Sequence, residues 1–473
     1  AKSHIIRSAA HQFEDGSALH WWHQCVPCGN AESTTNTKGF HRGIRSECSD
    51  DYLFLVYAVC EYIKFTGDNG LADIMVKYVT SEPLENGESE KYVSAYKTDF
   101  SESIFMHCVR ALERAYLRTG TKGLALLGSG DWCDGLNKAG SGMRGESVWL
   151  SMFLKFVTDM FCDVFSGDEK KSEYCDKFSQ KSAKLAENIK KHAYDQSAGY
   201  FLRAWYDDGT PIGSQVSDEC NIELISQAFS VFAGLPTAMS FSAMRNAYEK
   251  LYDSDAKIFK LLSPPFSACA KNPGYIKGYA PGIRENGGQY THGAAWGCMA
   301  MIISSCNVLK ASPNDSNARK MLSDGVHALI NLLPAYRCTD RQAFEIYKCE
   351  PYVLCGDIYA GDNPGRGGWS WYTGSAGWLW RAVLDCLFGI TLTGTLGNAG
   401  TTMDITFMPS AFRASFIIGS HFEISLEFPE RNLNLTVNYN KTGTERLLLD
   451  GTEQASRRIE LSSGKHVVDV EGI

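Results

Sequence analysis

SDDYLFLVYAVCEYIKFTGD, residues 49–68, is a long apolar run that opens on two helix-capping candidates, Ser49 and Asp50, and closes on Gly67. Ser and Asp accept hydrogen bonds from the free amides of a first helical turn, and glycine ends helices because positive φ costs it nothing. Apolar residues cover most of the circumference of this predicted helix, as expected for a helix buried on two sides. The stretch therefore predicts a fold with a helical core.

Runs of the same kind recur to about residue 390, at 101–120, 145–165, 172–195, 221–235, 291–306, 317–333 and 374–390. Long loops rich in Gly, Trp and Tyr separate them, at 20–50, 128–146, 263–291 and 346–375. Loops of that length in a compact domain are usually functional. We expect a mainly α fold, an α/α barrel over residues 1–392 with these loops on one rim. Alternating β-branched residues then predict a small antiparallel β-domain over 393–473.

Composition excludes several classes of partner. The net charge of −8 and the pI near 5.8 give no sign of nucleic-acid binding. No apolar run in the sequence indicates a membrane span. The 16 cysteines are scattered, which is typical of free thiols in a reducing compartment, and AKSHIIRSAA is no signal peptide. We therefore expect a cytoplasmic protein and, because no Met begins the chain, a processed product or a fragment.

GSGDWCDGLNKAG, residues 128–140, sets Asp131 and Asp134 on either side of Trp132 in a glycine-rich turn. A carboxylic acid beside an apolar ring has its pKa raised by desolvation, so it can protonate a leaving glycosidic oxygen near neutral pH. The competing explanation is an Asp turn with a helix N-cap, in which the indole only fills space.

Two further loops carry polar groups directly before helices. Arg284, Glu285, Gln289 and His292 lie within nine residues, and an imidazole at a helix start favours an anion such as phosphate, although a plain cap explains it as well. GRGGWSWYTGSAGW, residues 365–378, predicts a second anion cradle from Arg366, Thr373 and the amides of Gly374 and Ser375. Its Trp369 and Trp371 are either sugar platforms or core residues.

The N-terminal loops offer two more candidates. In HRGIRSECSDD, Arg42 and Arg45 precede Asp50 and Asp51, a combination that binds sugar hydroxyls or phosphate, or else forms a surface salt bridge beside a capping Asp. HWWHQCVPC contains the zinc-ligand types His20, His23, Cys25 and Cys28. No second matched half lies nearby, and the two His and two Trp residues equally suit a sugar cleft. We predict no metal.

Taken together and in order over about residues 11–390, these stretches resemble the inverting β-glycoside phosphorylases of glycoside hydrolase family 94, most closely their β-1,2-glucan branch. The stretches are HWWH, RGIRSECSDD, GSGDWCDGLNKAG, GESVWL, NPGYIKGYAPGIRENGGQYTHGAAW and EPYVLCGDIYAGDNPGRGGWSWYTGSAGWLWR. The resemblance implies an (α/α)6 barrel followed by a β-sandwich. It also implies phosphorolysis of β-linked gluco-oligosaccharides to α-glucose 1-phosphate and a shortened chain.

The resemblance further implies the roles of individual residues. Asp134 corresponds to the catalytic acid. The phosphate site corresponds to His292, Thr373, Gly374 and one of Arg42 and Arg45. Asp51, Arg45, Trp132 and Glu285 correspond to sugar-binding positions, and we expect Asp50, Asp131, Gln289 and Trp371 to bind substrate as well. Inorganic phosphate is the co-substrate and nucleophile, no cofactor is implied, and a homodimer is expected.

Several features depart from the family pattern. Cys133 stands where the family usually has Asn, and Glu47 replaces a basic residue. The N-terminal β-sandwich of family members is missing, so we expect a C-terminal part of a longer protein. Two other functions therefore stay open: an inverting hydrolase that uses Glu285 or Glu350 to activate water, and a non-catalytic glycan-binding segment of a glucan synthase.

Overall fold

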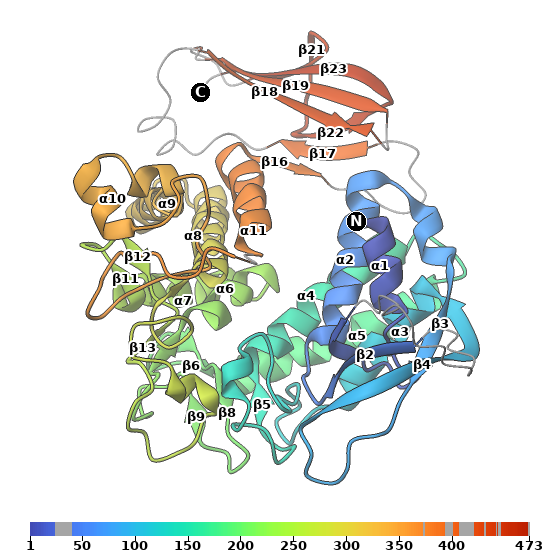
Figure 1. The fold of residues 1–473 in the computed structure, drawn as a ribbon. Coiled ribbons are helices and arrows are strands. Elements are labelled where there is room, and N and C mark those ends of the chain that lie inside the picture. Colours follow the sequence, from blue (N-terminus) through green and yellow to red (C-terminus); the bar gives the residue numbers. More distant parts are fainter. Residues whose placement is uncertain are drawn as a thin grey trace, which may run out of the picture.

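The computed structural model describes residues 1–23, 40–371, 374–392, 401–405, 421–429, 432–440, 442 and 446–471. Helices are the main regular elements up to residue 387, and strands form the C-terminal part of the described chain (Figure 1). The helices are α1 (Lys2–Ala9), α2 (Asp51–Thr66), α3 (Ile104–Leu117), α4 (Val148–Phe165), α5 (Ser172–His192), α6 (Leu224–Phe232), α7 (Thr237–Leu251), α8 (Thr291–Ala311), α9 (Ser316–Ile330), α10 (Arg341–Tyr347) and α11 (Ser375–Arg381). A π-helical turn, Ala382–Leu387, continues α11.

Several helix ends lie where local chemistry predicts, but the predicted N-cap of α2 is wrong: Asp50 makes no side-chain capping hydrogen bond, and Ser49 Oγ donates to the Leu127 and Gly130 carbonyls instead. Gly67 ends α2 in the left-handed conformation, with φ of 70°, and its amide donates to the Ile63 carbonyl at 2.8 Å. Ser103 and Ser147 cap α3 and α4, each accepting the amide of the residue three positions on. The eight helices predicted from sequence are confirmed. The structure adds α1, α7 and α10, whose apolar residues are sparser.

Consecutive helices pack in two layers. Helices α2, α4, α6 and α8 each contact the next in this series, and α11 packs on α8. Helices α3, α5, α7 and α9 lie behind them, each against its sequence neighbour. The series meets at its two ends, where Tyr57 of α2 stacks on Trp378 of α11 with ring centroids 5.6 Å apart. The helical core is thus as expected, while the complete six-pair barrel stays a prediction.

A four-stranded antiparallel sheet beside α3 corrects the mainly α expectation. Its order is β1 (Leu19–His23), β2 (Phe40–Ser46), β4 (Glu90–Ser103) and β3 (Met75–Thr80). Sequence analysis placed residues 20–50 in a loop and assigned nothing to β3 and β4. Strand β4, EKYVSAYKTDFSES, buries few of its residues and carries charges between them, so its apolar pattern is too weak to recognise. The fold is therefore mixed α/β.

Short strands join the helices at the rim that carries the loops. They are β5 (Glu146–Ser147), β6 (Tyr194–Asp195), β7 (Tyr200–Phe201), β8 (Ala204–Trp205), β9 (Pro211–Ile212), β10 (Ile222–Glu223), β11 (Tyr252–Asp253), β12 (Ile258–Phe259), β13 (Leu262–Ser263), β14 (Gln289–Tyr290) and β15 (Asp357–Ile358). Hairpins β6–β7 and β11–β12 are alike: each begins with Tyr-Asp and follows a helix of the outer layer.

The C-terminal strands lie at the end of the helices opposite to β5, β8, β9 and β13 (Figure 1). One sheet contains β16 (Ile390–Leu392), β17 (Thr401–Ile405) and β22 (Arg458–Leu461). The other contains β18 (His421–Phe428), β19 (Leu433–Asn440), β23 (Gly464–Glu471), β20 (Arg446–Leu449) and β21 (Thr452–Glu453). Strands β19 and β23 run parallel, so the antiparallel expectation is wrong for this pair and the sheet is mixed.

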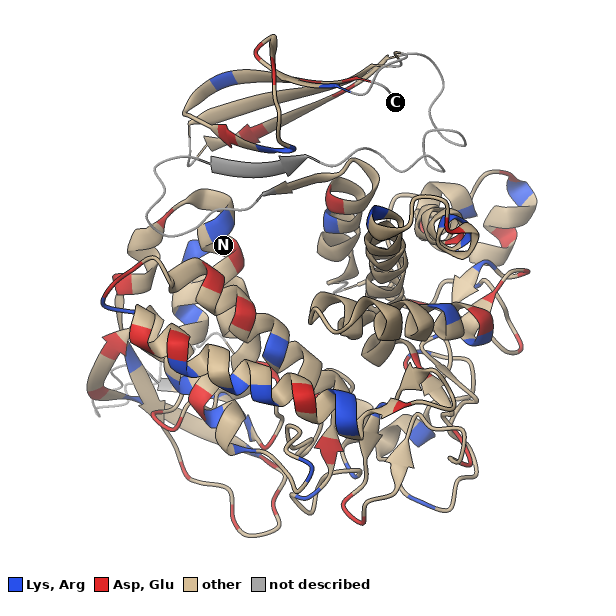
Figure 2. Ribbon diagram, turned by 180° about the vertical axis from the view of Figure 1, so that it is seen from behind, with Lys and Arg blue, Asp and Glu red and all other residues tan. Residues whose placement is uncertain are grey.

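Helix α8 lies at the centre of the helical part. Among the described residues it is the helix that is long and apolar enough to cross a membrane, yet 61% of its most apolar window is buried inside the protein. The outer helices are amphipathic. Lys and Arg are interspersed with Asp and Glu along them, as Figure 2 shows from behind, while α5 buries Phe178, Leu185 and Ile189.

Candidate active site

The loop that carries Asp134 is held from both sides by backbone contacts. Gly128 has φ of 62°, and a side chain there would meet the Glu47 carbonyl oxygen at 2.2 Å. Gly128 forms a β-bridge with Cys48, and the Ser49 amide donates to the Gly130 carbonyl at 3.0 Å. These contacts bring the segment before α2 against residues 128–134, although about 80 residues of chain separate them.

Asp131 is fully buried beneath this loop. Arg203 donates to both its carboxylate oxygens, at 2.8 Å and 2.5 Å, and Ser147 Oγ donates at 2.6 Å. The Cys133 amide donates to Asp131 at 3.1 Å, so its oxygens already have partners within the protein. Arg203 also donates to Glu223 at 3.1 Å, and burial raises the pKa of Glu223 to about 7. Asp131 thus sits in an ion-pair network that fixes the loop.

Asp134 begins a 3-10 turn, Asp134–Leu136, and its side chain is 52% exposed. Desolvation is the largest influence on its carboxyl, and the charges of Asp51, Asp131 and Glu285 add to it, while the His20 charge opposes them. The pKa of Asp134 is consequently raised to about 6. An accessible carboxyl with such a pKa can hold a proton near neutral pH and give it to a bound substrate.

His20, from strand β1, lies between two acids. Its Nδ1 is 2.9 Å from Asp51 Oδ1, and its Nε2 is 3.9 Å from Asp134 Oδ2. The hydrogen bond to Asp51 is the main cause that raises the pKa of His20 to about 9. The imidazolium therefore faces Asp134 at neutral pH. Sequence analysis noted HWWH but assigned His20 no role at Asp134, because only the fold brings the two together.

Trp132 connects this acid to the second predicted loop. Its Nε1 donates to His292 Nδ1 at 3.3 Å, and its ring lies edge-on to Tyr290. His292 also packs against Trp296, with ring centroids 4.2 Å apart. Burial lowers the pKa of His292 to about 3, so the ring is neutral. Because Nδ1 accepts the indole proton, the ring's own proton lies on Nε2, which has no hydrogen-bond partner within the described part of the chain.

A cavity of about 280 Å³ opens beside His292. It is lined by Arg284, Tyr290, His292, Gly356, Asp357, Trp369, Gly374 and Ser375. The buried Ser375 Oγ, like His292 Nε2, has no hydrogen-bond partner among the described residues. Thr373, predicted for the same place, lies outside the described residues. The cavity therefore offers two unsatisfied donors and the Arg284 guanidinium, which suits an anion such as phosphate.

Asp357 and Arg284 both line this cavity. No role is predicted for Asp357 from the sequence. Asp357 is buried, and its carboxylate accepts the amides of Trp369 at 2.8 Å and Arg284 at 3.2 Å. Burial raises the pKa of Asp357. Arg284 lies over the rings of Tyr279 and Trp369, at 4.7 Å and 5.6 Å from their centroids. Asp357 lies in the GDIYAGD sequence, within one of the stretches that resemble the family. No motif spacing there distinguishes Asp357 as a functional residue.

The other predicted residues of these loops differ in their surroundings. Glu285 is near the acid: it is among the charges acting on Asp134, and burial raises its pKa. Its Oε2 lies 3.4 Å from Arg284 Nε in an ion pair. Gln289 is fully buried, and its Oε1 accepts the Phe259 amide at 2.8 Å. Trp371 is 70% exposed, so its ring is accessible to a ligand.

The N-terminal candidates are also separated by the fold. Asp50 is buried, with the Cys48 thiol donating to it at 3.3 Å. Arg45 stacks on Phe13, 4.3 Å from the ring centroid, and donates to Ser81 Oγ at 3.3 Å. These contacts direct Arg45 toward the connection between β3 and β4. Arg42 lies at an exposed position of β2, opposite His23 of β1. Cys25 and Cys28 lie outside the described residues.

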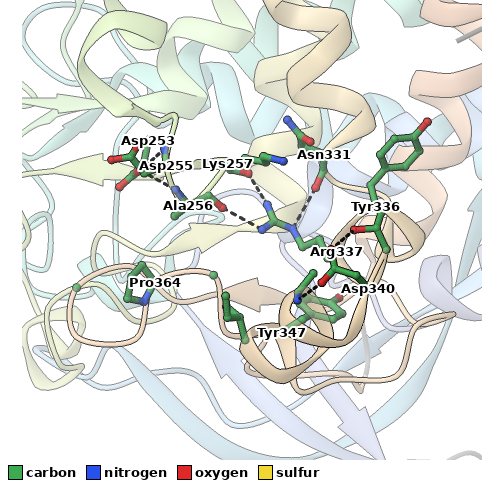
Figure 3. Close-up of a pocket in the computed structure, with 15 residues that line it drawn as sticks. Asp253, Asp255, Ala256, Lys257, Asn331, Tyr336, Arg337, Asp340, Tyr347 and Pro364 are labelled. Atoms are coloured by element: carbon green, nitrogen blue, oxygen red, sulfur yellow. Dashed lines mark hydrogen bonds between the residues drawn. The ribbon is translucent and has the colours of Figure 1, made fainter. Parts of the chain in front are cut away.

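A separate cavity of about 610 Å³ surrounds Arg337 (Figure 3). Arg337 donates to the carbonyls of Asn331 at 3.0 Å, Ala256 at 3.1 Å and Lys257. It joins the turn after β11 to the end of α9. The residues that line this cavity include none of the predicted site residues.

An accessible acid, the neighbouring indoles of Trp132 and Trp296, and a cavity with unsatisfied donors are typical of enzymes that act on carbohydrates. Residues 1–389 match the glycosyl hydrolase 94 superfamily, catalytic domain. The chain belongs to this superfamily, as the resemblance of its loops predicted.

Known relatives span the same region. The chain is 34% identical over 396 residues to cyclic beta-(1,2)-glucan synthase NdvB of Rhizobium meliloti (strain 1021), covering 83% of this chain and 13% of that protein. It is 25% identical over 391 residues to solabiose phosphorylase of Paenibacillus borealis, covering 82% and 44%. The chain thus spans less than half of either relative. Among solved structures, the GH63 mannosylglycerate hydrolase of Thermus thermophilus in complex with glucose aligns over 80% of this chain and 86% of that one, at 10% identity and a TM-score of 0.44.

Proposed function

We propose that the chain catalyses inverting phosphorolysis of β-linked gluco-oligosaccharides, with β-1,2-linked chains as the substrate. The observation that carries this proposal is the adjacency, through Trp132, of the raised-pKa acid Asp134 and the cavity at His292. Family membership supports the reaction type. The similarity to a β-1,2-glucan synthase supports the linkage.

In the proposed mechanism Asp134 protonates the glycosidic oxygen as the bond to the anomeric carbon breaks. A phosphate oxygen attacks that carbon from the opposite face, so the β-glucoside becomes α-glucose 1-phosphate and the shortened chain leaves with the proton. Phosphate is already an anion and a nucleophile, so this step requires no general base. The protein mainly positions the reactants and stabilises charge.

Within the cavity we assign the donors to phosphate. His292 Nε2–H and Ser375 Oγ–H would each donate one hydrogen bond, and Arg284 would supply the positive charge that the neutral His292 lacks. Thr373 and Gly374 keep their predicted part in this site. We assign Asp131 to holding the loop, since its oxygens are buried and already bonded.

The test is release of glucose 1-phosphate from β-1,2 gluco-oligosaccharides by the full chain, with and without inorganic phosphate. Phosphate-dependent release is the expected result. Release of free glucose without phosphate would favour the hydrolase, with Glu285 near Asp134 as the base. No turnover, with sugar binding retained, would favour a glycan-binding segment.

Asp134→Asn tests the assignment of the acid. The amide cannot donate the catalytic proton, so we expect kcat to fall by about 10²–10⁴-fold with little change in oligosaccharide affinity measured by calorimetry. Asp176→Asn, an exposed change on α5, is the matched control and should leave both values unchanged. Unaltered turnover in Asp134→Asn would refute the assignment.

A further inference from the structure

The segment before α2 brings a thiol to the catalytic acid. Cys48 is buried, and its Sγ lies with a nitrogen of His20 and a carboxylate oxygen of Asp134 so that all three atoms are within 4.8 Å of one another. We propose that His20, Cys48 and Asp134 form a binding site for a thiophilic divalent cation such as Zn²⁺, and that the bound ion inhibits the enzyme. Of these three residues, the proposed reaction assigns a chemical step to Asp134 alone.

The donor set suits zinc in type and in spacing. Zinc binds Cys sulfur at about 2.3 Å and His nitrogen or carboxylate oxygen at about 2.0–2.2 Å, so two donors of one tetrahedral ion lie about 3.5 Å apart. His20 Nε2 and Asp134 Oδ2 are 3.9 Å apart. Side-chain movements of about 1 Å would therefore close the three donors around one ion. A soft thiolate with an imidazole selects zinc over magnesium or calcium.

Outer hydrogen bonds orient two of these donors. Asp51 binds His20 Nδ1 with both its oxygens, at 2.9 Å and 3.1 Å, which leaves Nε2 directed toward Asp134. A carboxylate behind a ligating histidine is the usual arrangement at zinc sites, because it fixes the ring and raises its basicity. Asp50 accepts the Cys48 thiol at 3.3 Å and is placed to receive its proton when the thiolate binds metal.

The charges around the site favour a cation. Asp50, Asp51 and Asp134 converge there, and Glu285 also acts on Asp134. The Arg203 guanidinium is paired with Asp131 and Glu223 rather than with these acids. Metal binding requires a thiolate and a neutral imidazole, so the affinity should weaken as the pH falls.

Inhibition follows from the shared ligand. An ion on the Asp134 carboxylate takes the place of the proton that this residue donates, so the acid form cannot be present while metal is bound. This consequence rests on the proposed function. Metal binding itself does not, so it can be measured separately.

The experiment uses cobalt(II) as a probe with the full chain in phosphate-free buffer. A tetrahedral cobalt–thiolate complex gives an intense near-ultraviolet absorption band, and zinc competition for that band reports zinc affinity. We expect one zinc-displaceable band in the unaltered chain. Cys48→Ser should remove it and weaken zinc binding by roughly 100-fold or more. Asp51→Asn should weaken binding by about 10–100-fold and keep the band.

Two controls separate this site from other thiols. Cys220→Ser, at a buried cysteine between β9 and β10, should keep the band. The double variant Cys25→Ser/Cys28→Ser should also keep it. Loss of the band in that double variant, or its persistence in Cys48→Ser and in His20→Gln, would overturn the proposal. Zinc bound as expected with no effect on glucose 1-phosphate release would keep the site and contradict the inhibition, whereas absence of release in metal-free enzyme would reject the proposed function alone.

Discussion

At the scale of single residues, the central feature is the pKa of Asp134, which neighbouring charges raise and lower. Asp134 is made less acidic by desolvation and by three neighbouring carboxylates, and more acidic by the His20 imidazolium. Asp51 keeps His20 protonated. The pKa of Asp134, about 6, is therefore a balance that single substitutions can move in a chosen direction.

His20→Gln should move the pH profile upward. Removing the imidazolium removes the influence that lowers the pKa of Asp134, so the acid form persists to higher pH. The reaction needs the protonated acid, and its rate is lost as the pH rises through that pKa. We expect the alkaline limb of kcat/KM to move up by about 1 pH unit.

The control for this profile is His327→Gln, an exposed position on the outer helix α9. It should leave the alkaline limb in place. An alkaline limb that stays fixed or moves down in His20→Gln would show that His20 does not act on Asp134.

The contribution of an ion pair to the free energy of unfolding depends on how deeply the pair is buried. Arg203→Met should lower the free energy of unfolding by about 3–5 kcal/mol, because it leaves Asp131 and Glu223 buried without a cation. Chemical denaturation measures the change. Arg245→Met breaks an exposed pair with Glu249 at 3.9 Å and should cost less than about 0.5 kcal/mol. Equal losses in the two variants would contradict the structural role of Arg203.

At the scale of elements, the acid's 3-10 turn is positioned by a second 3-10 turn, Tyr275–Gly278, packed against it. Gly135 makes this close approach possible. A methyl group at Gly135 would lie 2.8 Å from Ile276 Cβ and 3.1 Å from its Cα. The two turns therefore cannot both keep their places if residue 135 carries a side chain.

Gly135→Ala should consequently impair catalysis more than folding. Displacing Asp134 by about 1 Å can lower kcat by roughly 100-fold, while the overpacking should cost about 1–3 kcal/mol of stability. Steady-state kinetics and thermal unfolding measure the two effects. Gly278→Ala, in the facing turn, is the matched control, since a methyl group there meets nothing within 4 Å. Similar kcat values for the two variants would argue against this positioning.

At the scale of the whole molecule, the C-terminal sheets are attached to the helical part by buried contacts. Tyr439 of β19 is fully buried, and its hydroxyl donates to the Phe388 carbonyl just beyond the π-helical turn. Phe388 also stacks on Phe422 of β18, with ring centroids 5.2 Å apart. Strands β18 and β19 lie at the end of the helices opposite to β5 and β13 (Figure 1).

Tyr439→Phe should therefore lower stability and leave catalysis alone. Loss of one buried hydrogen bond is expected to cost about 1 kcal/mol, seen as a lower denaturation midpoint. Glucose 1-phosphate release should keep its kcat and KM. Tyr352→Phe, at a side chain that is 82% exposed, should change neither quantity. A fall in kcat would instead indicate that the C-terminal sheets influence the site.

Local sequence patterns were insufficient to predict the N-terminal sheet and the parallel pairing of β19 with β23. Helix α2 follows from a continuous apolar run and from Gly67 at its end, which act within a few positions along the chain. Strand β4 has no such run, and its order beside β2 and β3 depends on partners elsewhere in the sequence. Whether β19 pairs with β23 in parallel depends on the path of the chain between them, which residue alternation does not specify.

The amino-acid sequence by itself determined the helices and the family and singled out the candidate site loops, because periodicity and motif spacing are local properties. Tertiary structure decided the electrostatics. Arg203 reaches Asp131 across 72 positions, and Trp132 reaches His292 across 160. Burial makes His292 neutral, and the opposed charges of His20 and the carboxylates set the pKa of Asp134. Desolvation and charge–charge distances exist only once the chain is folded, so only the folded structure shows which acid keeps its proton.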